Sequence, residues 1–119
     1  MYTYSFEKLE VWKEAIQLAI STYKITKLLP KEEKYGLTSQ MRRCSVSISS
    51  NIAEGTSRLT KKDKAHFMTI SYSSSLELLN QLIISKELDL ISDENFIKLR
   101  QDIESITNKI NSLRNHILK

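Results

Sequence analysis

Residues that interrupt regular structure are scarce in this sequence, which has two glycines and one proline among 119 residues. So few breaks leave room for only a few turns, and long helices with short connections are the expected arrangement. The only cysteine, Cys44, excludes an intrachain disulfide and fits a reducing compartment. No uncharged apolar run approaches the ~20 residues of a membrane helix, and the first residues lack the basic start and apolar block of a signal peptide. We therefore expect one soluble, cytoplasmic domain over residues 1–119 that does not enter a membrane.

The side chains that build most enzyme and metal sites are also scarce. A di-iron site in a helical bundle needs paired Glu-x-x-His motifs, whereas the nearest match here is Asp63 three residues before His66. One cysteine is too few for a zinc site, and glycines only at Gly36 and Gly55 exclude a phosphate-cradling loop. Cys44 lies in an apolar stripe, which favours a small buried hydrophobe over a nucleophile. We expect no enzyme activity, no catalytic residue, no metal and no cofactor.

Apolar residues at steps of three and four predict a first helix over residues 6–29. The helix carries two apolar seams, one that includes Trp12 and Tyr23 and one from Ala15 to Leu29, so we expect two neighbouring helices and a buried position for both aromatic rings. Pro30 ends this helix because proline disfavours helical geometry in the residue before it.

A second helix is predicted from about Lys34 to Ala53, with Gly55 in the position of a left-handed C-terminal cap. Its apolar stripe consists of Leu37, Met41, Cys44, Ile48 and Ile52. The remaining positions are mostly serine, threonine and other uncharged polar residues, which weaken helix propensity, so packing on more than one side is expected to hold this helix. That arrangement indicates an interface, and the candidate oligomer contacts are Tyr35, Leu37, Gln40, Ser47 and Asn51.

Thr60 is the expected N-cap of a third helix that reaches about Leu88, and Ser92 is the expected N-cap of a fourth. The fourth helix has an unbroken seam at Phe96, Leu99, Ile103, Ile106, Ile110, Leu113 and Ile117. Short connections make successive helices antiparallel. The sequence therefore predicts an all-α fold, an antiparallel up-and-down four-helix bundle.

The second helix also carries a resemblance to a known family. The runs from Lys31 to Arg43, from Val46 to Ile48 and from Ser50 to Gly55 resemble the signature of the 23S rRNA intervening sequence proteins, which are small bacterial four-helix bundles. Matching residues extend over nearly the whole chain and include Phe6, Leu9, Val11, Trp12, Ala15, Phe67, Glu77, Leu78, Gln81 and Leu82. Serine stands at positions 49, 71 and 73, where the family usually has proline, alanine and glycine.

The resemblance implies several functional expectations. Relatives are encoded within intervening sequences of 23S rRNA genes, and the fold is similar to the accessory variability determinant of diversity-generating retroelements, a homopentamer that binds nucleic acid and a reverse transcriptase. For this chain the resemblance implies a homopentamer that binds nucleic acid, RNA rather than DNA. A reverse transcriptase or another protein is a candidate partner.

Positive charge is concentrated in one part of the sequence. Between residues 34 and 64, seven cations stand against Glu54 and Asp63, a local charge of +5, whereas the whole chain carries +4. Such clustering is the electrostatic footprint expected of a surface that binds a polyanion. The candidate nucleic-acid-binding residues are Arg42, Arg43, Arg58, Lys61, Lys62 and Lys64. Two alternatives remain open: the Lys-rich turn is a solvated loop, or the two arginines pair with Glu54 or with an acidic residue of a neighbouring subunit.

No aromatic side chain lies between Leu37 and His66, the part of the sequence that holds all six candidate residues. We therefore expect contacts to phosphates without readout of the bases. Tyr2, Tyr4 and Tyr35 lie outside every regular seam and are free to contact a partner.

The predicted function is that of a non-enzymatic, oligomeric nucleic-acid-binding protein that contacts phosphates through the second helix and the turn after it. The alternative is a protein-interaction scaffold with no role in nucleic-acid binding, in which the arginines form intersubunit salt bridges.

Overall fold

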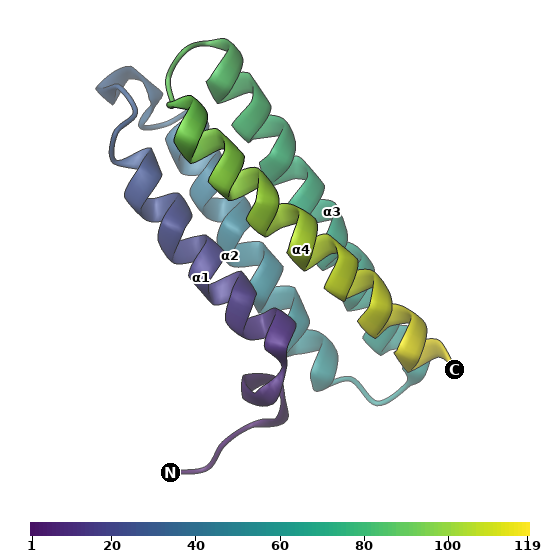
Figure 1. The fold of residues 1–119 in the computed structure, drawn as a ribbon. Helices are drawn as coiled ribbons and strands as arrows, with labels where there is room; N and C mark the ends of the chain where they lie inside the picture. The colour runs from purple at the N-terminus through teal and green to yellow at the C-terminus, as the bar shows by residue number, and fades with distance from the viewer.

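The structure, a computed structural model that describes all 119 residues, is a bundle of four helices (Figure 1). The helices are α1 (Glu10–Thr26), α2 (Leu37–Thr56), α3 (Lys61–Glu87) and α4 (Asp93–Leu118), and two short 3-10 turns, η1 (Ser5–Lys8) and η2 (Lys31–Glu33), precede α1 and α2. Successive helices run antiparallel, and each packs against two neighbours: α1 and α3 both contact α2 and α4. The predicted up-and-down four-helix bundle is therefore confirmed. No helix is long and apolar enough to cross a membrane.

The core contains three of the predicted apolar seams together with Met68, Leu78 and Leu82 of α3. Met41, Cys44, Ile48 and Ile52 of α2 are buried, as are the four central residues of the α4 seam from Leu99 to Ile110. Of the two seams predicted for the first helix, the one from Ala15 to Leu29 is fully buried, although α1 ends at Thr26, three residues earlier than predicted, and Leu29 follows it in a turn. The other seam is only half-buried along most of its length, because it lies at the boundary between α1 and α2.

The chain before α1 differs from the prediction. Residues 6–9 do not belong to α1: η1 ends at Lys8, and Leu9 has extended backbone (ψ 126°) before the helix begins at Glu10. The backbone N–H of Tyr4 donates to the Glu7 carboxylate (2.8 Å), and the N–H of Glu7 donates to the Tyr4 carbonyl (3.1 Å). These bonds satisfy polar groups locally and turn the first residues away from the helix axis.

Small side chains line the contact between α2 and α3. Ser71 donates a hydrogen bond to the backbone carbonyl of Ile48 (2.8 Å), and the hydroxyls of Ser47 and Ser74 lie 2.9 Å apart. Contact between a side chain on one helix and the backbone of the other requires a close approach of the two helices. Serines therefore fill interior positions of α3 where long apolar residues would hold α2 further away.

Gly55 serves the same close approach and is not the predicted left-handed cap. Helix α2 continues through it to Thr56, and no glycine has a positive φ. A Cβ atom at this position would lie 2.6 Å from Met68 Cε and 3.0 Å from Phe67 Cβ on α3. The left-handed cap lies instead at Asp89 (φ 59°), after α3. There the N–H of Leu90 donates to Ser85 O at 2.9 Å, which closes the helix end.

Both predicted N-caps are confirmed. Thr60 Oγ1 accepts a hydrogen bond from the backbone N–H of Asp63 (3.0 Å), and Ser92 Oγ accepts one from the N–H of Asn95 (3.1 Å). Each bond satisfies one of the free donors at the start of its helix, which fixes α3 and α4 to begin at Lys61 and Asp93.

Replacement of Gly55 by valine is expected to destabilise the protein by about 1–3 kcal/mol, because the added atoms overlap α3. The matched change Ser50→Val places the same side chain on the exposed face of α2 and should cost less than about 0.5 kcal/mol. Chemical denaturation followed by circular dichroism measures both. Equal stability of the two variants would contradict a close approach of the helices at this glycine.

Candidate nucleic-acid interface

The structure divides the predicted basic residues into two groups at opposite ends of α2. Arg42 and Arg43 lie in its first two turns, whereas the other four surround its connection to α3. About thirteen residues of helix, or ~20 Å, separate Arg43 from the end of α2. The basic turn, as we call the second group, consists of Arg58, Lys61, Lys62 and Lys64.

The basic turn is only partly neutralised. Arg58 lies 3.8 Å from the carboxylate of Asp63, and its guanidinium covers one face of the Phe67 ring at 5.1 Å. Lys61 donates to the backbone carbonyl of Lys119 (2.8 Å), which brings the turn beside the end of α4. Lys62 is exposed and takes part in no ion pair. A lysine without such a bond, as Lys62 is, can approach a phosphate without breaking an internal contact.

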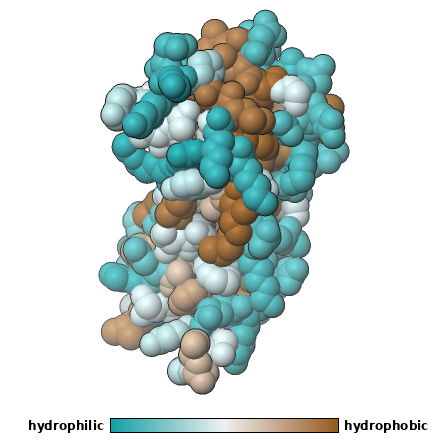
Figure 2. Space-filling view, turned by 90° about the vertical axis from the view of Figure 1, so that its left-hand side faces the viewer, coloured by the Kyte–Doolittle hydropathy of each residue, from teal (hydrophilic) through white to brown (hydrophobic).

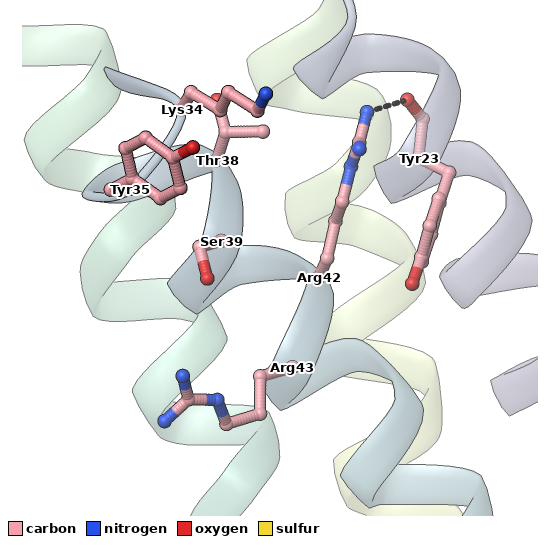
Figure 3. A pocket seen from close by; sticks show the side chains of 7 residues that line it. All are labelled: Tyr23, Lys34, Tyr35, Thr38, Ser39, Arg42 and Arg43. Atoms are coloured by element: carbon pink, nitrogen blue, oxygen red, sulfur yellow. Dashed lines mark hydrogen bonds between the residues drawn. The ribbon is translucent and has the colours of Figure 1, made fainter. Parts of the chain in front are cut away.

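Arg42 links two helices of one subunit. Its Nε donates to Thr26 Oγ1 (2.9 Å), its Nη2 donates to the carbonyl of Tyr23 (3.4 Å), and the guanidinium stacks on the Tyr23 ring at 4.7 Å (Figure 3). These contacts join α2 to α1 and occupy two of the five N–H donors of the guanidinium, which makes Arg42 less available to a phosphate than an unbonded arginine. Tyr23, predicted to be buried, is 42% exposed because its ring lies on the surface to support this arginine.

Arg43 points away from Tyr23 and is exposed (Figure 3). Neither Arg42 nor Arg43 forms an ion pair with Glu54, so that alternative is wrong within one subunit. Arg43, Lys34 and Tyr35 border a shallow hollow of about 400 Å³ at this end of the bundle. Of the predicted arginines in α2, Arg43 is therefore the one whose charge is available to a partner.

The five predicted oligomer contacts have different environments. Tyr35 is 87% exposed, Gln40 is exposed, and Leu37 is half-buried. Ser47 and Asn51 are used within the subunit, since the Asn51 amide donates to Ser47 O (2.8 Å) and Ser47 Oγ lies beside Ser74. The first three side chains remain available for contact with a second subunit.

A groove between α1 and α2 is an exposed apolar surface that was not predicted from the sequence. It measures about 450 Å³, and we call it the α1–α2 groove; its lining residues are Ile16, Ala19, Ile20, Tyr23, Lys24, Lys27, Val46 and Ser49. Ile20 and Val46 are each 43% exposed. On the side of the molecule where α1 lies, apolar residues form a broken stripe between hydrophilic ones (Figure 2). The signal in the sequence was the seam that includes Trp12 and Tyr23, because Ile16 and Ala19 continue the same spacing on α1.

Cys44 is a buried part of the core, as predicted. Burial, offset only in part by hydrogen bonding from Gln81, raises the pKa of its thiol from 9.0 to about 11. The thiol is therefore protonated near neutral pH and is a poor nucleophile. No group of three or more His, Cys, Asp or Glu side chains lies close enough to hold a metal ion.

Fold and surface define this protein as a small all-α bundle with charged and aromatic side chains exposed at its ends. It belongs to the 23S rRNA-intervening sequence protein family, whose profile matches residues 7–112. Among solved structures it is similar to a protein with unknown function from the S23 ribosomal protein family of Bacteroides thetaiotaomicron. The two share 21% identity with a TM-score of 0.81, over 87% of this chain and 97% of the other, which shows a common fold. No curated protein matches the sequence.

Replacement of Cys44 by alanine is expected to cost about 1 kcal/mol at neutral pH, because one buried group is removed from the core. The raised pKa adds a dependence on pH: the thiol ionises near pH 9.0 in the unfolded chain but near pH 11 in the folded one, so stability falls as pH rises through this window. Denaturation at pH 8 to 11 should show a steeper decline for the parent than for Cys44→Ala. Parallel declines would mean that the thiol is not buried.

Proposed function

We propose that this protein is a non-enzymatic homopentamer that binds nucleic acid, RNA in preference to DNA, through the phosphates. The observation that carries the proposal is the basic turn, in which four cations surround one short connection and only Arg58 is paired with a carboxylate. Clustered cations with free charge are the main source of affinity for a polyanion. Membership of the family agrees with this proposal through its ribosomal RNA context.

Ring formation would strengthen this interaction. Each subunit contributes the basic turn, and a closed ring of five would repeat it around one rim, which multiplies the local positive potential. The α1–α2 groove supports assembly because it leaves apolar side chains of two helices in contact with water. Exposed Tyr35 and Gln40 lie at one end of α2 and would extend such a contact.

The second candidate function is a scaffold that binds another protein, such as a reverse transcriptase, without contact to nucleic acid. The exposed apolar groove is the observation that favours it. In that function the basic turn only keeps the surface solvated. The intramolecular contacts of Arg42 remove one of the two arginines proposed for intersubunit salt bridges.

The double variant Lys61→Ala/Lys62→Ala should weaken binding to RNA and DNA alike, because phosphate contacts carry no sequence information. The slope of log affinity against log salt concentration should fall in magnitude by about 1 for each phosphate that the variant no longer neutralises. Fluorescence anisotropy across a salt series measures both quantities.

The control Lys13→Ala/Lys31→Ala removes the same charge from exposed positions outside the basic turn. It should change affinity and slope much less. If the two double variants bind equally, the effect is one of net charge and the basic turn is not the site. If the Lys61/Lys62 variant binds as tightly as the parent throughout, the scaffold function takes precedence.

Light scattering of dilute protein should give a mass of about 69 kDa, five times the subunit mass of 13.8 kDa. Ile20→Glu should lower that mass, because a carboxylate buried in an apolar contact without a partner is costly. Leu76→Glu, a matched change at an exposed leucine on α3, should leave it unchanged. A monomeric mass for the parent at micromolar concentration would contradict the ring.

A further inference from the structure

Four aromatic rings form a continuous ladder from the core to the solvent. Trp12 meets Phe6 edge to face with ring centroids 5.1 Å apart, Phe6 stacks with Tyr4 at 6.2 Å, and Tyr4 stacks with Tyr2 at 4.8 Å and an interplanar angle of 6°. Tyr2 is 70% exposed and Tyr4 is 61% exposed. We call Tyr2, Tyr4 and Phe6 the aromatic arm.

Backbone hydrogen bonds hold the aromatic arm in place, although the rings of Tyr2 and Tyr4 are exposed. The hydrogen bonds between Tyr4 and Glu7 fix the turn before α1, and Trp12 anchors Phe6 against the bundle. The chain ahead of this turn leaves the bundle and projects into solvent (Figure 1). Tyr2 and Tyr4 therefore present an aromatic stack whose outer surface has no partner within the subunit.

The aromatic arm and the basic turn lie at the same end of the bundle. Tyr4 and Phe6 share a cavity of about 400 Å³ with Ser57, the residue before Arg58. A second cavity joins Ser5 to Lys64. In Figure 1 the N-terminus and the connection between α2 and α3 are both at the lower end of the molecule. The fold thus brings aromatic side chains from the first residues of the chain beside the basic turn, which has none of its own.

We propose that the aromatic arm stacks with unpaired bases of a single-stranded nucleic acid whose phosphates contact the basic turn. The proposal rests on the proposed function and adds a preference for single strands. An exposed aromatic ring beside a positive surface is the combination that binds single strands, because every base offers a face for stacking. A duplex keeps its bases stacked inside and offers only its ends to the arm.

Leu59 lies within the basic turn, between Arg58 and Lys61 in the sequence, and supports the same occupant. Its side chain is 97% exposed at the centre of the basic turn, where no neighbouring side chain covers it. An apolar side chain among cations contributes little to a contact with phosphates alone. It can pack against the face or edge of a base that has left a helix.

The test compares Tyr2→Ala/Tyr4→Ala with Tyr2→Phe/Tyr4→Phe, which keeps the rings. The ligands are a 20-nucleotide single-stranded RNA, the same sequence as single-stranded DNA, the RNA duplex, and inorganic polyphosphate, which has charge without bases. The alanine variant should bind both single strands about tenfold or more weakly than the parent, whereas the phenylalanine variant should bind them almost as the parent does. Affinity for polyphosphate should be unchanged in both variants.

Several results would overturn the proposal. If the alanine variant binds single strands as the parent does while the Lys61/Lys62 variant is weakened, the proposed function stands and the stacking is wrong. If the alanine variant loses as much affinity for polyphosphate as for single strands, the arm acts only through the charge or the folding of the protein. A smaller oligomer mass for the alanine variant would place the arm in a contact between subunits. Absence of any binding by the parent would overturn the proposed function as well.

Discussion

The close packing of α2 against α3 is the constraint on which the rest of the structure depends. Helix α2 has little intrinsic tendency to be helical, because serine and threonine compete for its backbone hydrogen bonds. Close packing against α3 compensates for this low helix propensity. Ser71 donates a hydrogen bond to the α2 backbone at Ile48, and Gly55 leaves space for Met68. The small side chain of Ser71 therefore adds a hydrogen bond across the contact without holding the two helices apart.

This packing decides where the charged surfaces lie. Because α2 remains helical through Gly55, the two groups of cations lie at opposite ends of the bundle and form separate surfaces. One end combines Arg43 with exposed Tyr35, and the other combines the basic turn with the aromatic arm. Arg42 lines the same hollow as Arg43, but two of its donors hold α1 and α2 together beside the α1–α2 groove.

Much of the fold was predictable because the signals are local. Apolar spacing identified the buried stripes of α2 and α4, and Thr60 and Ser92 cap the helices that they were expected to cap. The predictions that were wrong concern positions where the same local sequence pattern is compatible with two structures. A glycine near a helix end can be a left-handed cap or a point of close contact, and Gly55 is the second because α3 lies against it. Asp89 takes the left-handed conformation instead.

The sequence by itself determined the class of fold, the burial of Cys44 and the presence of excess positive charge near the second helix, since each follows from composition or from spacing along one helix. Only the tertiary structure decided which charges are free and which aromatic rings lie beside them. Arg42 and Arg43 are adjacent in sequence, yet about 100° of helical rotation turns one toward Tyr23 and the other toward solvent. Tyr4 and Arg58 are far apart in sequence, and the antiparallel packing of α1 and α2 brings their segments to one end of the bundle.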